Sequence, residues 1–424
     1  MTWKPKDFVN EKMAHRAALR SGTRVWVMTT LVLLLASVVQ AEEGAERGVA
    51  LAAAGQYQQA WTFLKGETGG SPAVQTARVI TAATLGFGIE AAKSAGALAA
   101  NDRTSAAQLM DAGESLGQVA LFSPAVDCFS SALKLAPGSF RAAMDLAATY
   151  HAQEKFPEAA VAAKRASELL PASFQAHYVL GSALISAGKT VEGLMALRDA
   201  RKLRPNDGGL LTLLGVEYIK QRYFSEAVEV LQAAVTLEPG SERLALLLIS
   251  AVESHSSAQQ AKEIALRALQ NIPHSARLYM QLGVEEEASG DLASAKQHYG
   301  RSIELNPSIA ESHYLLGDVL YREGNDYPRA TKFLQQAIDL APDFTDAYLR
   351  MGSALIAMEK YSDAEITLNR AVKTAPDDSR LYARLITCYR KEGQQEKLQE
   401  AVTVLSRLHR RDEGGLVPQE RAFP

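Results

Sequence analysis

The sequence GGLLTLLGVEYIKQRYFSEAVEVLQAAVTLEPGS, at residues 208–241, contains the pattern that decides the fold. Its first half places residues three and four apart, as on one face of an α-helix: Leu211, Leu214, Gly215 and Tyr218. Its second half repeats this helical spacing: Phe224, Ala227, Leu231 and Ala234. Pro239 ends the second helix, because proline lacks an N–H and its ring clashes with the preceding turn. The stretch predicts two short amphipathic helices that approach most closely at Gly215 and Ala227.

The same pattern returns along the chain with a period of 34. The glycine at 215 has counterparts at Gly113, Gly181 and Gly283. The alanine at 227 has counterparts at Ala125, Ala159, Ala261 and Ala295. The closing prolines are Pro137, Pro171, Pro205, Pro239, Pro273, Pro307, Pro342 and Pro376. One extra residue, which we assign to the turn at 324–327, lengthens a single interval to 35 and leaves both helices of that unit intact.

A pattern with this period and these features resembles the tetratricopeptide repeat family. The stretch Ala310–Phe344 is a second good match. The resemblance covers 106–411 as nine units, and it implies an all-α fold: a right-handed α-solenoid of stacked helix-turn-helix repeats, in which each unit packs only on its neighbours. Gly193 replaces the usual alanine at repeat position twenty, so we expect looser helix contacts there. The same expectation applies at Ile249 and Ile386, which replace the small residue at position eight.

The regions outside the regular array divide the chain further. Residues 42–105 are expected to form an irregular helical N-terminal region with one degenerate repeat, marked by Gly55, Tyr57, Ala60 and Leu64. Residues 412–424 have little apolar content and are expected to form a disordered tail.

Residues 1–41 have the order of an export signal. A basic segment precedes the uncharged apolar run 25–39, and small residues precede Glu42. The run is shorter than the ~20 residues that cross a bilayer comfortably. We therefore expect cleavage after Ala41 and export to the periplasm or the cell exterior. The alternative is a retained membrane anchor at 25–39.

The sequence offers little that could perform chemistry. Gly113-Glu114-Ser115-Leu116-Gly117 matches a nucleophile elbow, but it lies within a predicted helix, whereas that motif needs a preceding strand. The histidines lack metal-ligand spacing, and His177 and His313 share repeat position four, where packing residues are expected. No phosphate or dinucleotide fingerprint is present, so we expect no catalytic residues, cofactor or metal. A formal net charge of −3 argues against bulk electrostatic binding of nucleic acid.

The resemblance also implies where a partner binds. Each helical residue turns by about 100°, so repeat positions two, five, nine, twelve and thirteen lie opposite the packing side of each first helix. In the family, that side lines a concave groove. Carried over to this chain, the groove residues are Met144, Tyr178, Ser182, Ile185, Val216, Ile219, Leu246, Met280, Val284, Tyr314, Asp318, Tyr321, Arg322, Arg380, Arg390 and Lys391. The middle of this set is apolar and its C-terminal end is basic, which suits a peptide with an apolar stretch and an acidic flank.

The sequence therefore predicts a non-enzymatic scaffold that binds a protein or peptide partner in an exported or envelope assembly. Two alternatives stay open: a self-associating structural oligomer, and a non-catalytic subunit of an enzyme complex. The basic residues could also be a solvated face, and curvature of the array could bury part of the apolar strip. The family's grip on chaperone C-termini uses lysine and asparagine at positions five and nine. Here, for example, Met144 and Ala148 occupy those positions, so we expect no such clamp.

Overall fold

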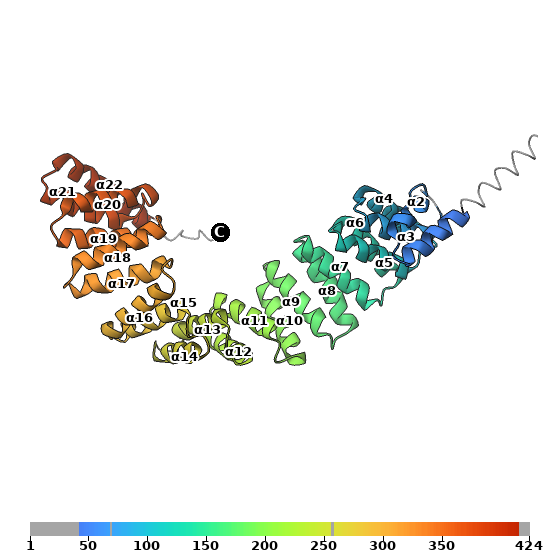
Figure 1. The fold of residues 1–424 in the computed structure, drawn as a ribbon, viewed down its shortest axis with the longest axis horizontal. Coiled ribbons are helices and arrows are strands. Elements are labelled where there is room, and N and C mark those ends of the chain that lie inside the picture. Colours follow the sequence, from blue (N-terminus) through green and yellow to red (C-terminus); the bar gives the residue numbers. More distant parts are fainter. Residues whose placement is uncertain (1–41, 68–69, 256–257, 415–424) are drawn as a thin grey trace, which may run out of the picture. The chain divides into compact units, whose positions relative to one another are not determined.

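The computed structural model describes residues 42–67, 70–255 and 258–414, and within these residues every regular element is a helix (Figure 1). The chain divides after Pro205 into two compact units, which we call unit 1 (Met1–Pro205) and unit 2 (Asn206–Pro424). Among the described helices, none combines the length and the apolar character needed to cross a membrane. The predicted export signal at 1–41 lies outside the described residues.

Unit 1 is a series of antiparallel helix pairs. Its first helix spans 42–53 and is followed by α2 (Tyr57–Leu64), α3 (Pro72–Thr84), α4 (Gly88–Ala99), α5 (Ala106–Gln118), α6 (Phe122–Leu135), α7 (Phe140–Ala152), α8 (Phe156–Leu169), α9 (Phe174–Ser186) and α10 (Thr190–Leu203). Neighbouring helices pack on one another along the series, as in a solenoid (Figure 1).

Unit 2 has the same construction. Its helices are α11 (Gly208–Lys220), α12 (Phe224–Leu237), α13 (Glu242–His255), α14 (Ala258–Asn271), α15 (Ala276–Ala288), α16 (Leu292–Leu305), α17 (Ala310–Glu323), α18 (Tyr327–Leu340), α19 (Thr345–Ala357), α20 (Tyr361–Thr374), α21 (Ser379–Lys391) and α22 (Gln395–Gly414). The all-α repeat architecture predicted from the sequence is confirmed. The helix α22 continues to Gly414, so 412–414 are helical although the sequence predicted a disordered tail from 412; the rest of that tail lies outside the described residues.

Helix starts follow the proline period. From Phe140 to Ala310, the first helices of successive repeats begin at the same constant interval as the prolines, and the single longer step falls before Thr345, as the sequence predicted. The frame also extends one repeat further back, because α3 begins at Pro72, one full period before the start of α5. The segment 42–105 thus contains a second helix pair, α3 and α4, in addition to the one degenerate repeat that the sequence indicated.

Local chemistry sets the ends of these helices. Several first helices start at a residue whose side-chain oxygen accepts a hydrogen bond from an N–H of the first turn: Ser105, Ser139, Ser173, Asp207, Ser275 and Asp378. From α3 onward, every described turn within a repeat contains one residue with positive φ: Gly86, Ala120, Glu154, Gly188, Arg222, Gly290, Gly324, Glu359 and Gly393. Glycine adopts this conformation without strain, whereas the other residue types incur a steric cost.

Small residues allow the two helices of a repeat to pack closely. A methyl group on Gly215 would lie 2.5 Å from Cδ2 of Leu231, which is fully buried. At Gly193 the structure corrects the sequence-based expectation of loose contacts. A methyl group there would lie 2.8 Å from the carbonyl oxygen of Gly181, because two facing glycines let α9 and α10 approach closely.

Candidate functional site

The sequence-predicted groove residues lie in both units. Unit 1 contains Met144 on α7 and Tyr178, Ser182 and Ile185 on α9. Unit 2 contains Val216 and Ile219 on α11, Leu246 on α13, Met280 and Val284 on α15, Tyr314, Asp318, Tyr321 and Arg322 on α17, and Arg380, Arg390 and Lys391 on α21. The face of each first helix that presents these positions is called its inner face below.

The apolar members of the set are half-buried, and none is among the largely exposed apolar side chains of the described chain. Neighbouring first helices pack on one another, for example α17 on α19, and this contact covers part of each side chain. Tyr314 packs against Phe344, with ring centroids 4.8 Å apart. The open apolar strip suggested by the sequence is therefore a half-buried one, in line with the alternative that curvature covers part of it.

In unit 2 the inner faces of α17, α19 and α21 line an open cavity of about 250 Å³, which we call the inner pocket. Its lining residues are Tyr314, Asp346, Leu349, Arg350, Ser353, Arg380, Ala383 and Arg384. It therefore combines three arginines and one aspartate with an aromatic and aliphatic wall. A concave site with an apolar wall and a few converging polar side chains is typical of a binding site.

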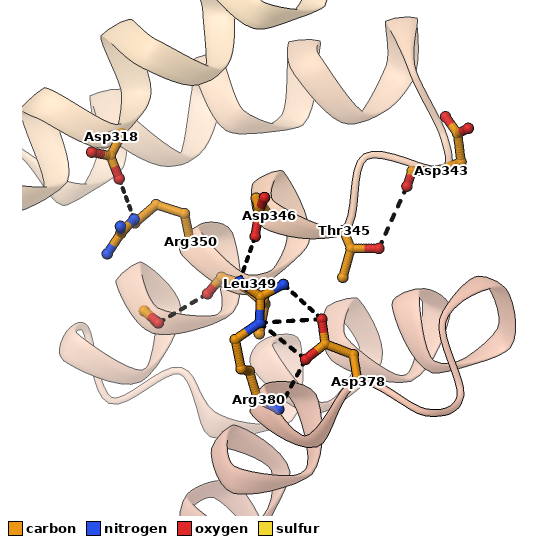
Figure 2. Close-up of polar contacts among 9 residues, drawn as sticks. Asp318, Asp343, Thr345, Asp346, Leu349, Arg350, Asp378 and Arg380 are labelled. Atoms are coloured by element: carbon orange, nitrogen blue, oxygen red, sulfur yellow. Dashed lines mark hydrogen bonds and ion pairs between the residues drawn. The ribbon is translucent and has the colours of Figure 1, made fainter. Parts of the chain in front are cut away.

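Two carboxylates hold Arg380 on one side of the inner pocket (Figure 2). Its Nη1 donates to Asp346 Oδ1 at 2.8 Å, and its Nη2 donates to Asp378 Oδ2 at 2.7 Å. The Arg380 hydrogen bonds lower the pKa of Asp378 below its ordinary value. The same two carboxylates raise the pKa of Arg380, so this side chain stays charged.

A second set of ion pairs, centred on Asp318, links α17 to α19 and α15. Asp318 is buried and forms ion pairs with Arg350 (Figure 2) and, at 2.8 Å, with Arg322. Arg322 also pairs with Glu287 on α15, and the Arg350 guanidinium lies 5.1 Å from the ring centroid of Tyr321. The predicted groove residues Asp318, Tyr321 and Arg322 thus belong to one network that ties neighbouring repeats together.

Three cations on α21 differ from these paired arginines. Within the described residues, Arg384, Arg390 and Lys391 have no carboxylate within ion-pair distance. Arg384 donates from Nε to Ser353 Oγ at 3.0 Å, and Ser353 in turn donates to the carbonyl oxygen of Leu349 at 2.9 Å. Three of the four cations of α21 therefore have no ion-pair partner among the described residues.

The histidines at repeat position four serve the fold. His177 Nε2 lies 2.9 Å from the carbonyl oxygen of Pro171, and His313 Nε2 lies 3.0 Å from that of Pro307. Tyr382 donates its hydroxyl to Pro376 in the same way, at 3.0 Å. Each side chain thus ties a first helix to the end of the preceding repeat. In the described part of the chain, no group of three or more His, Cys, Asp or Glu side chains is placed to hold a metal ion.

A larger cavity lies on the outer side of unit 1. It has a volume of about 590 Å³ and lies between α8 and α10, over Leu180 and Leu184 of α9. Val161 and Met195 flank it and are 73% and 59% exposed. The small alanines of α8, together with the close approach of α10 to α9 at Gly193, leave this groove open.

Sequence reasoning counted Arg350 and Arg384 within the basic C-terminal end of the groove, but it did not assign their repeat position, six, to the groove lining. The positions that it assigned to the groove were two, five, nine, twelve and thirteen, whereas Arg350 and Arg384 occupy position six and line the inner pocket. Position six lies one helical turn after position two, on the same side of the helix. Its place between two assigned positions was the signal that could have assigned both arginines to the pocket lining.

Three family models that match this chain all describe the same family. Models described as tetratricopeptide repeat match 152–208 and 280–344, 209–241, and 322–387. A "Protein SGT1 homolog" of Oryza sativa subsp. japonica is 28% identical over 125 residues, which make up 30% of this chain. The match spans about a third, 32%, of that relative's length.

Solved structures that align with this chain include the following two. MamA from Desulfovibrio magneticus RS-1 is 21% identical, with a TM-score of 0.36, and the alignment covers 40% of this chain and 96% of that one. The C-terminal part of a TPR repeat-containing protein from Cytophaga hutchinsonii is 14% identical, with a TM-score of 0.48, and the alignment covers 56% of this chain and 98% of that one.

Proposed function

Because this chain is a member of the tetratricopeptide repeat family, whose repeats support a role as a protein–protein interaction scaffold, we propose that it binds a polypeptide partner on the inner face of unit 2. The family and its fold are typically non-catalytic. The observation that carries the proposal is the inner pocket, where half-buried Tyr314 and Leu349 adjoin Arg384, a cation with no ion-pair partner among the described residues. An apolar wall beside such a cation can hold a peptide by burial and by charge at once.

The experiment compares partner capture by inner-face and outer-face variants. Tyr314→Ala removes part of the pocket wall and should reduce recovery of the partner that the wild-type protein captures from its native compartment. Ile366→Ala is the control, because Ile366 is 64% exposed on α20 and does not line the inner pocket. Both variants are first checked for unchanged helical content. Equal recovery with Tyr314→Ala and with wild type would remove the proposal.

The same proposal includes export of the mature chain. It is supported by the order of basic, apolar and small residues in 1–41. Sequencing the N-terminus of protein isolated from its native host should give Glu42 as the first residue. An intact N-terminus in the membrane fraction would instead establish the retained anchor at 25–39.

A self-associating oligomer is the second candidate, and the outer groove of unit 1 favours it. Val161 and Met195 are large apolar side chains that face solvent beside that groove. Light scattering should then show a molar mass that rises with protein concentration and that falls to the monomer value in Val161→Lys/Met195→Lys. A concentration-independent monomer would eliminate this candidate.

A further inference from the structure

The outer groove of unit 1 differs from the rest of the outer surface in having apolar walls. Repeat position twenty-two is solvent-exposed on the second helices from α6 to α20, and it holds Val161 on α8 and Met195 on α10. On α6, α12, α14, α16 and α18 the same position holds a charged or amide side chain: Asp127, Glu229, Glu263, Gln297 and Lys332. Ile366 on α20 is apolar, but its neighbour on α18 is a lysine. Adjacent exposed apolar side chains on two neighbouring helices therefore mark the α8–α10 groove as an interaction surface.

The groove has the dimensions of one short helix. Its lining runs along α8 from Pro157 to Glu168 and along α10 from Lys189 to Asp199, which is about 15–17 Å at the rise of an α-helix. Helices pack by placing a ridge of side chains into the groove between the side chains of their neighbours. A ridge about three turns long, with apolar residues near its middle, is therefore the shape that this groove accepts.

Helix α10 itself carries such a ridge. Val191 and Met195 are four residues apart, so they lie on one side of the helix, and they are 66% and 59% exposed. Charged side chains stand on either side of them along the chain. Lys189 and Glu192 lie near the start of α10, and Asp199 lies towards its end, where it also pairs with Lys202 at 2.7 Å.

We propose that the chain forms a closed dimer in which α10 of each copy lies in the outer groove of the other copy. A two-fold contact uses the same surface on both chains, so it is complete at two. The two-fold axis crosses the helices at the level of residue 194, the midpoint of the groove lining on α10, so the two α10 helices are antiparallel. This inference rests on self-association, the second candidate function above, and it names the contact and the number of chains.

The charges along the groove favour the antiparallel orientation. Lys189 and Asp199 lie about 7.5 Å before and after the midpoint. The antiparallel dimer therefore places Lys189 beside Asp199 of the second copy. Lys164 of α8 lies one period before residue 198, so in the same dimer it comes within a helical turn of Glu192 of the second copy. Symmetry makes each of these contacts occur twice.

The other two-fold orientation brings like charges together. An axis along the helices would place Lys189 beside Lys189 of the second copy and Asp199 beside Asp199, and like charges that face each other across an interface repel. The helix dipoles would also be parallel in that arrangement, whereas they are opposed in the antiparallel one. Charge complementarity thus identifies a second copy of this chain, in one orientation, as the occupant of the groove.

Apolar side chains meet at the centre of the proposed contact. Val191 and Met195 of one copy lie over Val161 of the other and over its groove floor, which Leu180 and Leu184 of α9 form. None of the residues that line the inner pocket lies on α8 or α10, so dimer formation and partner binding use different side chains.

The first measurement is sedimentation equilibrium of the full-length protein over a range of concentrations. The molar mass should rise with concentration and level off at two chains. Val161→Lys/Met195→Lys should stay monomeric, because it places charge in the apolar centre. Ile366→Lys is the matched control, since it introduces the same charge at the same repeat position on α20, and it should dimerise like wild type.

Charge reversal tests the orientation. Lys189→Glu alone and Asp199→Lys alone should each raise the dissociation constant of the dimer about tenfold, because one reversal turns two symmetry-related attractions into repulsions. The combined variant Lys189→Glu/Asp199→Lys should recover most of the wild-type affinity, because opposite charges then face each other again. Unchanged helical content in all three variants shows that the fold is retained.

Three results would overturn the two-fold dimer. They are a monomer at every concentration, a molar mass that grows beyond two chains, and a combined reversal that dimerises no better than the single ones. Growth beyond two chains would leave self-association standing and would refute only the closed contact. Partner binding by the inner face is decided separately, by capture with Tyr314→Ala.

Discussion

The close contact between α11 and α12 predicts that Gly215→Ala destabilises its repeat. A methyl group at this position would lie 2.5 Å from both Cγ and Cδ2 of Leu231. Leu231 is fully buried, and Cγ is not the free end of its side chain, so the clash cannot be relieved by a terminal rotation alone. We therefore expect the change to move the helices apart or to force Leu231 from its rotamer.

The magnitude follows from two opposing contributions. Overpacking a well-packed core costs about 1–3 kcal/mol, and the 2.5 Å contacts favour the upper end of that range. Replacing glycine by alanine within a helix contributes about 1 kcal/mol of stability in return. The net expectation is a loss of about 2 kcal/mol, which makes opening of the pair about thirtyfold more frequent.

Gly300→Ala is the matched control. Gly300 lies inside α16 of the same unit, and a methyl group there would meet no atom within 4 Å. The propensity gain of about 1 kcal/mol should then appear without an overpacking cost.

The assay is native-state hydrogen exchange on the full chain, which reports opening of individual repeats and does not require a single two-state transition. Amides of α11 and α12 should exchange about thirtyfold faster in Gly215→Ala, and amides of α16 should exchange more slowly in Gly300→Ala. If both substitutions slowed exchange equally, the reasoning about close helix approach would be refuted.

Three further predictions follow from turns, thiols and carboxylates. Glu359 and Gly188 both have positive φ, which strains every residue type except glycine. Glu359→Gly should therefore raise the free energy of unfolding by about 0.5–1 kcal/mol, and Gly188→Ala should lower it by about 1 kcal/mol. Thermal unfolding measures both, and a loss of stability in Glu359→Gly would contradict the strain argument. Burial raises the pKa of the Cys128 thiol to about 12 and that of the Cys388 thiol to about 11. Neither thiol should therefore react with a disulfide reagent at pH 8 until the protein is denatured. Fast reaction of the native protein would show that a thiol is accessible. The pKa of Glu253 is raised from 4.5 to about 8, first by partial burial and then by the hydrogen bond and charge of Glu285. The folded protein therefore keeps a proton that the unfolded chain releases, and its stability should fall as the pH rises from about 4.5 through 8. Glu253→Gln should then raise the melting temperature at pH 9 and leave it unchanged at pH 4, and an equal effect at both pH values would exclude the titration.

The periodic part of the fold could be predicted from the sequence because packing repeats with the helices. Pro239 and Ala227 recur at fixed intervals, and the described helices start in that register. The pair α3 and α4 was missed because Arg78 and Gly88 stand where the pattern has a leucine and an aromatic residue. Arg78 is nevertheless buried and donates from Nη1 to the carbonyl oxygen of Glu67, so a polar contact replaces the usual apolar one.

The inner pocket was harder to predict because its charges depend on which residues of neighbouring repeats pair with each other, and not on the pattern of a single repeat. Arg380 and Asp346 share repeat position two in neighbouring units and form an ion pair across one full period of the array. Side chains at one position of adjacent first helices therefore face each other, and opposite charges there neutralise each other within the array. Arg350 and Arg384 share position six with like charge, and such a pair cannot be satisfied by itself. Comparing charges at the same position of neighbouring units separates opposite-charge pairs from like-charge pairs. From the sequence alone it marks α19 and α21 at position six, and also Arg243 and Arg277 at position two of α13 and α15. Applied to every pair of neighbouring repeats, the same comparison would identify charged side chains on the array surface that are available to a partner.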